Sequence, residues 1–274
     1  MTETVELGLL DGFERALIND RLHLVYQPKI CLKTGKLVRV EALVRWDDPE
    51  FGQVPPSRFV PLAERHGLID PLTRWGMDAA FHQWHRWRAD GIDCGLAFNI
   101  SAISLKALDF PDLVEAKCEE HLVPPGMLVL ELTESATQPL ANLLDTLTRF
   151  RIKGIGLAID DFGTGYSSLM QLRQLPFSEL KIDRFFINDA VENADSRAIV
   201  KAMIDLAHAL GISATAEGVE TSAQLRLMSE MDCDIAQGYR IARPLEPDAL
   251  PEWLDAWQRD WEQNCTPSRQ ALGR

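Results

Sequence analysis

Polar side chains at the ends of short apolar segments are the residues of this sequence best suited to chemistry. Segments 128–134 and 156–162 each run through apolar residues and then reach carboxylates. Comparable segments elsewhere reach a further carboxylate, an amide or an ammonium in the same way. The residues at these segment ends are Glu41, Asn99, Glu131, Asp160, Asp161, Lys181, Glu217 and Gln237. One aspartate at such a place is usually a helix cap or a turn residue, but its recurrence along the chain indicates a site.

Five carboxylates gathered at one place repel one another and tend to hold protons, and bound cations relieve that repulsion. Oxygen ligands without cysteine or histidine favour hard ions such as Mg²⁺ or Mn²⁺ over zinc. The adjacent pair Asp160-Asp161 suits two neighbouring ions, with Asp160 able to bridge them. Two ions roughly 3.5–4 Å apart are the usual arrangement for hydrolysing phosphate esters. The set therefore indicates a metal-dependent hydrolase of a phosphate ester.

The elements that must position these residues are short apolar strands that alternate with helices. Segments 22–28 and 37–46 predict an antiparallel hairpin around the turn-like residues 33–36. Further strands are expected at 95–100, 128–134, 156–162, 179–184, 212–218 and 234–239. Helices are expected at 57–66, 70–89, 109–121, 138–152, 167–174, 195–210 and 221–230.

Eight strands over about 250 residues predict an α/β fold, a (β/α)8 barrel of the TIM type with an antiparallel first strand. The carboxyl ends of parallel barrel strands meet at one mouth, which would bring the polar residues together. A doubly wound open sheet is the rival fold, but it requires a glycine-rich phosphate loop after the first strand, and the sequence has none. The barrel domain is expected over residues 11–258, with an N-terminal extension at 1–10 and a C-terminal tail at 259–274.

Composition narrows the partners and the compartment. The 274 residues carry a formal charge of 28 − 41 = −13, and 46% are hydrophobic, as in a globular protein. This charge argues against long nucleic acids and anionic membranes. Five cysteines without a CxxC pair argue against a disulfide framework or a zinc site. With no signal peptide and no apolar stretch near the ~20 residues of a membrane span, a cytoplasmic location is expected.

Eight short motifs in order resemble those of EAL-domain cyclic di-GMP phosphodiesterases, and the resemblance covers residues 11–258. A lone EAL tripeptide would carry no information, but the ordered set is highly specific. The motifs are YQP at 26–28, EALVRW at 41–46, NIS at 99–101, ELTE at 131–134, DDFGTGYSS at 160–168, LKIDR at 180–184, AEGVE at 216–220 and QGY at 237–239. Small departures are Arg240, which could alter the rim of the groove, and Phe185, which affects local packing.

The resemblance implies hydrolysis of cyclic di-GMP to linear pGpG, with two Mg²⁺ or Mn²⁺ ions per active site and a water that attacks the phosphorus. It assigns one metal to Glu41, Asn99, Glu131 and Asp160, and the other to Asp160, Asp161 and Glu217. Lys181 would steady the water and the developing negative charge, so the catalytic set is Glu41, Lys181 and Glu217. The resemblance assigns substrate binding to Gln27, Leu43, Arg45 and Gln237.

The resemblance further implies a mobile loop after Asp161, bent at Gly163 and Gly165 and anchored by Glu134. It also implies a homodimer and leaves open whether the chain stands alone or belongs to a longer sensor protein. Two other functions stay open: a receptor that binds cyclic di-GMP without cutting it, and a phosphodiesterase for another phosphate ester. Receptors of this type have usually lost metal ligands, and this sequence has lost none.

Two further patterns are expected to be structural. His82 and His85 lie three residues apart on an expected helix, but no third metal ligand is evident, so a surface or packing role is favoured. Trp253, Trp257 and Trp261 recur every four residues and predict one face of a closing helix. That face would pack on the barrel, with a subunit contact as the alternative.

Overall fold

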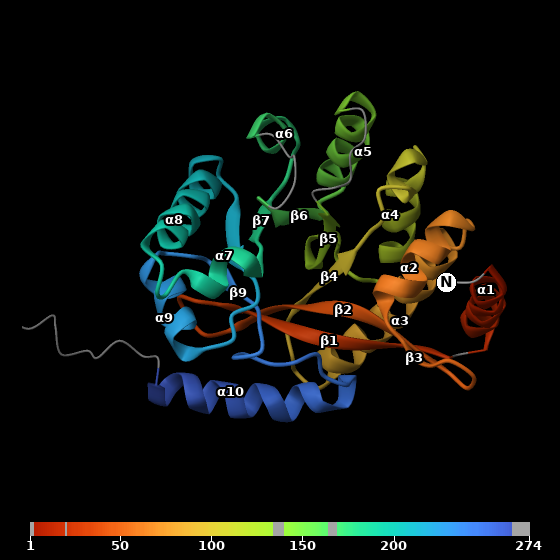
Figure 1. Ribbon diagram of the computed structural model, residues 1–274, viewed down its shortest axis with the longest axis horizontal. Coiled ribbons are helices and arrows are strands. Elements are labelled where there is room, and N and C mark those ends of the chain that lie inside the picture. Colours follow the sequence, from red (N-terminus) through yellow and green to blue (C-terminus); the bar gives the residue numbers. More distant parts are fainter. Residues whose placement is uncertain (1–2, 20, 134–139, 164–168, 265–274) are drawn as a thin grey trace, which may run out of the picture.

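The computed structural model describes residues 3–19, 21–133, 140–163 and 169–264, and its strands close into a barrel (Figure 1). The sheet has the order β1-β9-β8-β7-β6-β5-β4-β2-β3, and a pairing between β1 and β2 closes it. The strands are β1 (Leu22–Cys31), β2 (Leu37–Asp48), β3 (Gly52–Val54), β4 (Gly95–Asn99), β5 (Leu128–Thr133), β6 (Gly156–Phe162), β7 (Glu179–Ile182), β8 (Ser213–Ala216) and β9 (Ile235–Ala236). Eight of them form the barrel and β3 extends β2, so the predicted fold class is confirmed.

Helices follow the strands and surround the barrel, as the alternating pattern predicts (Figure 1). They are α1 (Glu3–Ile18), α2 (Pro56–Arg65), α3 (Ile69–Ala89), α4 (Phe110–Glu120), α5 (Leu140–Ile152), α6 (Leu169–Gln174), α7 (Arg184–Asp189), α8 (Ala194–Ala209), α9 (Ser222–Glu230) and α10 (Leu250–Asn264). The helices α1 and α7 and the strand β3 were not expected from the sequence. Among the described residues, no helix combines the length and apolar character needed to span a membrane.

The first strand runs against both of its neighbours in the barrel. β1 pairs antiparallel with β2 and with β9, whereas β2 and β4 to β9 pair in parallel. Gln27 faces Glu41 across the β1–β2 ladder, and Lys29 faces Arg39. Paired residues of antiparallel strands project to the same face, so both pairs send their side chains into the barrel.

Small residues line parts of the barrel interior and leave space for long charged side chains. A Cβ atom on Gly95 would lie 2.7 Å from Cγ of Arg39, so only glycine lets that arginine pass. Near the amino ends of the parallel strands, an Arg39 Nη1 atom lies 2.9 Å from Oε2 of Glu179. The hydroxyl of Thr215 donates to the other oxygen of Glu179 at 2.6 Å. This ion pair, with Glu179 buried and Arg39 partly buried, lies at the end of the barrel opposite the mouth.

A second apolar cluster lies outside the barrel, where α1 covers the extended part of β2 (Figure 1). Phe13 of α1 is fully buried and stacks on Phe59 of α2 with ring centroids 5.3 Å apart. The ring of Trp46 meets Phe13 edge to face at 5.4 Å. The helix α1 thereby joins α2 and the end of β2 into one packed unit.

The tryptophan face of α10 packs on the barrel, which confirms the structural prediction for this stripe. In Figure 1, α10 runs beneath the β1–β2 hairpin. Trp257 is 4% exposed, and its Nε1 donates to the carbonyl of Gly35 in the hairpin turn at 2.9 Å. Trp253 donates to the carbonyl of Ile241 at 3.1 Å. Both indole donors are therefore satisfied within the chain.

Replacing Trp257 with alanine should lower the free energy of unfolding by about 3–5 kcal/mol, because it empties a buried aromatic site. Urea denaturation followed by circular dichroism measures this loss. Gln258→Ala changes an exposed residue of the same helix and should cost less than about 0.5 kcal/mol. Loss of a dimer without loss of stability in Trp257→Ala would instead favour a subunit contact.

Candidate active site

The predicted site residues gather at the barrel mouth, most of them at or near the end of a parallel strand. Glu41, Asn99 and Glu131 belong to β2, β4 and β5. Asp160, Asp161 and Lys181 belong to β6 and β7, while Glu217 and Gln237 directly follow β8 and β9. Parallel pairing places Asn99 beside Glu131 in the register of β4 and β5. Residues far apart in the sequence thereby meet at one place.

Glu41 is held by amide groups on both of its oxygens. Asn99 donates from Nδ2 to Oε1 at 2.6 Å, and Gln237 donates from Nε2 to Oε2 at 2.7 Å. The same amide nitrogen of Gln237 also lies 3.1 Å from Oε1 of Gln27. Glu41 is 7% exposed. These contacts fix the carboxylate orientation and join four of the predicted residues.

Lys181 occupies the centre of the remaining carboxylates. Its Nζ lies 2.5 Å from Oε2 of Glu131 and 2.7 Å from Oε1 of Glu217. Asp160 approaches the same ammonium with Oδ1 at 3.0 Å. Lys181 is 1% exposed, so water screens these contacts little. One ammonium thus organises three of the predicted metal ligands.

Lys29 is a charged residue of this site that the sequence analysis missed. Its side chain is buried and its Nζ donates to Oε1 of Glu131. A usable signal was present, because Lys29 stands two residues after Gln27 in a strand and so shares its face. The site was predicted from the strands expected to run in parallel, and Lys29 lies on β1, which runs antiparallel to both of its neighbours.

Asp160 and Asp161 present neighbouring carboxylates because of an unusual backbone turn. Asp161 has φ of 55°, in the left-handed region, and its backbone N–H donates to Oδ1 of Asp160 at 2.9 Å. Oxygen atoms of Asp160, Asp161 and Glu217 all lie within 4.8 Å of one another. This spacing and the all-oxygen donor set fit a hard divalent cation. Gly163 follows with φ of 98°, as expected for a bend.

The site carries more negative than positive charge. Five carboxylates and two ammonium groups sum to −5 + 2 = −3 when all are ionised. The carboxylates are Glu41, Glu131, Asp160, Asp161 and Glu217, and the ammonium groups are Lys29 and Lys181. Such an excess in a poorly solvated place is relieved by bound protons or by cations.

The carboxyl groups of the site differ in pKa, because some have more neighbouring positive charge than others. Burial raises the pKa of Glu217 to about 8, and the neighbouring charges of Asp160 and Glu41 add to this, although Lys181 opposes it. Burial and the charge of Asp160 raise the pKa of Asp161 to about 6. Burial also acts to raise the pKa of Glu131, but Lys181 and Lys29 outweigh it and hold the value at about 2.

An apolar cavity of about 610 Å³ meets the site at Asn99, whose amide donates to Glu41, and is large enough for a nucleotide-sized ligand. Leu43, Arg45 and Asn99 lie in its wall, together with residues of α2 and α3. Of the predicted substrate-binding residues, Leu43 and Arg45 therefore line this cavity, and Gln27 and Gln237 lie at Glu41. Glu134 and Gly165 lie outside the described residues.

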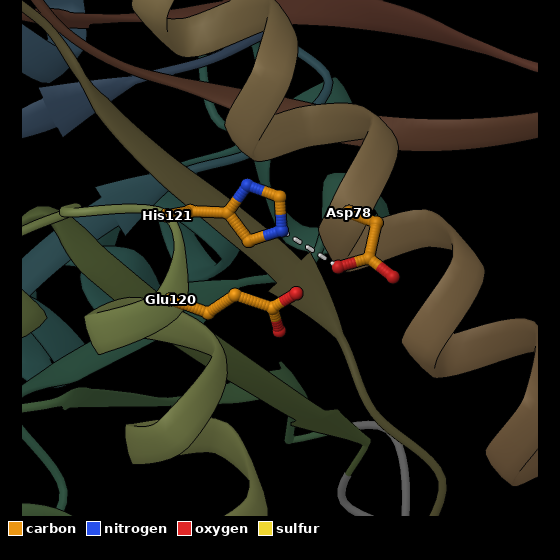
Figure 2. Close-up of side chains that lie close together, drawn as sticks. All are labelled: Asp78, Glu120 and His121. Carbon is orange, nitrogen blue, oxygen red and sulfur yellow. Dashed lines mark hydrogen bonds and ion pairs between the residues drawn. The ribbon is translucent and has the colours of Figure 1, made fainter.

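A second acidic group lies between α3 and α4, formed by Asp78, Glu120 and His121 (Figure 2). Lys117 already supplies a cation there, because its Nζ lies 2.8 Å from Oδ1 of Asp78 and 3.0 Å from Oε2 of Glu120. His121 contributes Nε2 at 2.8 Å from the same Oδ1. Partial burial acts to raise the pKa of Asp78, but the hydrogen bonds from Lys117 and His121 lower it overall. This group is an ion-paired clamp between two helices.

The histidine pair beside this clamp takes part in the helix packing. The ring of His82 lies 4.7 Å from that of His121, and Nδ1 of His82 is 2.7 Å from the carbonyl of Asp78. His85 contacts the carbonyl of His121 through Nε2. These contacts support the predicted surface or packing role for His82 and His85.

Stability of the metal-free protein should fall as pH rises between about pH 5 and pH 8. Folded Glu217 keeps its proton up to about pH 8, whereas an ordinary glutamate loses it near the reference value of 4.5. Unfolding therefore releases this proton within that window, and higher pH favours the unfolded state. Melting temperatures measured in chelator across the window test this. Glu217→Gln should flatten the profile, and a profile that stays steep would contradict this origin.

The matched control for this profile is Glu220→Gln, which changes an exposed glutamate in the same loop. It should leave the slope of melting temperature against pH unchanged.

Comparison with known proteins places the chain in a family. The model of the EAL domain matches residues 11–244. MucR of Pseudomonas aeruginosa, a bifunctional diguanylate cyclase and cyclic di-GMP phosphodiesterase, is 40% identical over 89% of this chain and 36% of its own length. The cyclic di-GMP phosphodiesterase PA2567 of the same organism is 39% identical over 90% of this chain and 42% of its own length. The chain therefore spans well under half of these relatives.

A solved structure agrees with the sequence match. The PaMucR phosphodiesterase in complex with c-di-GMP superposes with a TM-score of 0.83 at 40% identity, covering 89% of this chain and 99% of that one. The ordered motifs, the barrel and the family model thus all indicate an EAL domain, which confirms the resemblance found in the sequence. The chain belongs to the EAL domain family.

Proposed function

We propose that this chain is a metal-dependent phosphodiesterase that hydrolyses cyclic di-GMP to linear pGpG in bacterial second-messenger signalling. The observation that carries the proposal is the excess of negative charge at the mouth beside the apolar cavity. Relatives named as cyclic di-GMP phosphodiesterases, and the c-di-GMP complex of one neighbour, support the choice of substrate. We further propose a cytoplasmic location and a homodimer.

The donor set fits Mg²⁺ or Mn²⁺, two ions per site. The proposed ligands are Glu41, Asn99, Glu131, Asp160, Asp161 and Glu217, all of which offer oxygen. Divalent ions bound there would activate a water as a nucleophile and offset negative charge on the phosphate. The reaction forms a bond from the water oxygen to phosphorus and breaks one P–O ester bond, which opens the ring.

Protein groups position the reactants and the charge. Lys181 already bridges three carboxylates, so its ammonium is fixed close to where charge develops and needs little reorganisation. Arg45 lies in the cavity wall, with Nη1 held by the carbonyl of Val44 at 2.9 Å. We assign Arg45 to a phosphate of the substrate, since a guanidinium suits paired contacts with phosphate oxygens.

A receptor that binds cyclic di-GMP without cutting it is the alternative. The complete ligand set argues against it, because a receptor does not require the Asp160, Asp161 and Glu217 group. Tight binding without hydrolysis by protein saturated with Mg²⁺ or Mn²⁺ would favour the receptor. Turnover of another phosphate ester alone would instead change the substrate.

Glu41→Ala should abolish hydrolysis of cyclic di-GMP, with a fall in kcat of at least about 100-fold, because it removes a proposed metal ligand and frees Asn99 and Gln237. The measurement is pGpG formation with Mg²⁺ or Mn²⁺, with chelator as the metal-free comparison. Circular dichroism must show that the variant is folded. Residual wild-type activity would remove Glu41 from the site.

Asp78→Asn is the matched control, because it changes a carboxylate of the second acidic group, which contains none of the predicted site residues. Its hydrolysis rate should equal that of the wild-type protein.

Arg45→Ala should raise KM for cyclic di-GMP about tenfold while kcat changes less, since the assigned contact is with a phosphate in the bound substrate. Steady-state kinetics over a range of substrate concentrations separates the two constants. An unchanged KM would contradict the assignment of Arg45 to substrate.

A further inference from the structure

Lys29 is a charged residue at the proposed metal site to which the proposed reaction gives no role. Its side chain is 1% exposed and that of Glu131 is 0% exposed. Lysine is almost never fully buried unless it is paired, so Lys29 can be buried here only because it contacts Glu131. An ammonium therefore lies in contact with a carboxylate that is also a proposed metal ligand.

The two lysines at Glu131 differ in what else they contact. Lys181 bridges Glu131 to Asp160 and Glu217 at the mouth. Within the described part of the chain, the ion pair of Lys29 is with Glu131 alone. Each oxygen of Glu131 thus takes one ammonium, Oε1 from Lys29 and Oε2 from Lys181. The ion pair of Lys29 thus involves one carboxylate, whereas those of Lys181 involve three.

The position of Lys29 is fixed by strands rather than by a loop. It lies on β1 with its neighbour across the ladder, Arg39, on β2. Arg39 serves a different buried carboxylate, Glu179, with Nη1 and Oε2 2.9 Å apart. The Lys29–Glu131 pair at the mouth is therefore separate from the Arg39–Glu179 pair at the opposite end of the barrel. Only the pair at the mouth adjoins the proposed metal ligands.

An ammonium and a divalent ion compete electrostatically for the same carboxylate. Lys29 stabilises the charge of Glu131 when no metal is bound, and it repels a divalent ion that binds beside it. The positive charge of Lys29 therefore lowers the free energy of the metal-free site relative to that of the metal-bound site. By linkage, removing that charge must destabilise the metal-free protein and strengthen metal binding.

We propose that Lys29 is a positioning residue that acts as a built-in counter-cation of Glu131, stabilising the metal-free site and setting how tightly it takes up divalent ions. The inference rests on the proposed function for its metal site, although it requires no hydrolysis. In this role Lys29 keeps a ligand carboxylate in place before a metal arrives, and it weakens binding enough for the metal to exchange.

Lys29→Met tests this, because methionine keeps the length of the side chain and removes the charge. Isothermal titration calorimetry with MnCl₂ and no nucleotide should show Mn²⁺ binding about fivefold tighter or more than in the wild-type protein. The melting temperature in chelator should fall by about 5 °C or more. The rise in melting temperature on adding Mn²⁺ should be larger than in the wild-type protein.

Arg39→Met is the matched control, because it removes a cation from a buried carboxylate at the far end of the barrel. Its melting temperature in chelator should also fall, but its Mn²⁺ affinity should stay within about twofold of wild type. Lys29→Gln serves if Lys29→Met does not fold without metal, since it replaces the ammonium with a shorter, neutral side chain that still carries an N–H donor. It should also bind Mn²⁺ more tightly.

The outcomes separate the inference from the proposed function. Unchanged or weaker Mn²⁺ binding by both Lys29 variants would overturn the counter-cation role. Failure of both to fold even with saturating Mn²⁺, while Arg39→Met folds, would overturn it too. Absence of Mn²⁺ binding by the wild-type protein would refute the metal site and the inference together. Binding by the wild-type protein without hydrolysis of cyclic di-GMP would remove only the proposed activity.

Discussion

The contact of Glu131 with two buried ammonium groups is the constraint on which the rest of the barrel interior depends. A fully buried carboxylate is stable only with compensating charge, and Lys29 and Lys181 supply it from β1 and β7. These long side chains need space, which fully buried alanines such as Ala97 and Ala158 leave on neighbouring strands. The small interior residues and the charged ones are therefore parts of one arrangement.

The net charge of −13 takes on a different meaning once the site is located. Five of those charges belong to carboxylates at the mouth, where they are concentrated rather than spread over the surface. Two divalent ions would add +4 and leave −13 + 4 = −9 for the loaded protein. A chain that is acidic overall can then receive an anionic ligand, because the local field at the mouth differs from the global charge.

Most residues of the mouth could be predicted from the sequence, because the carboxyl ends of parallel barrel strands lie at the same end of the barrel. That rule located residues such as Asp160 and Glu217 from their places at segment ends. It failed for Lys29, because β1 runs the opposite way and its inward residues enter the site from within the strand. The six-residue helix α7 and the three-residue strand β3 were missed because segments so short carry too little periodicity. The helix α1 was missed because its packing on α2 and β2 is a tertiary feature.

The carboxylates of the site differ in how far they are buried, and Glu131 and Glu217 show the difference. Glu131 lies where no solvent reaches it, and two lysines keep its pKa at about 2, so it stays charged at any physiological pH. Glu217 lies nearer to solvent at 18% exposed, shares its ammonium with two other carboxylates and has a pKa raised to about 8. The charge of Glu131 is therefore always balanced by the two lysines. The charge of Glu217 is instead balanced by what binds there, a proton in the metal-free protein or a cation in the metal-bound one. Glu217 therefore belongs to the part of the site whose bound ions can exchange.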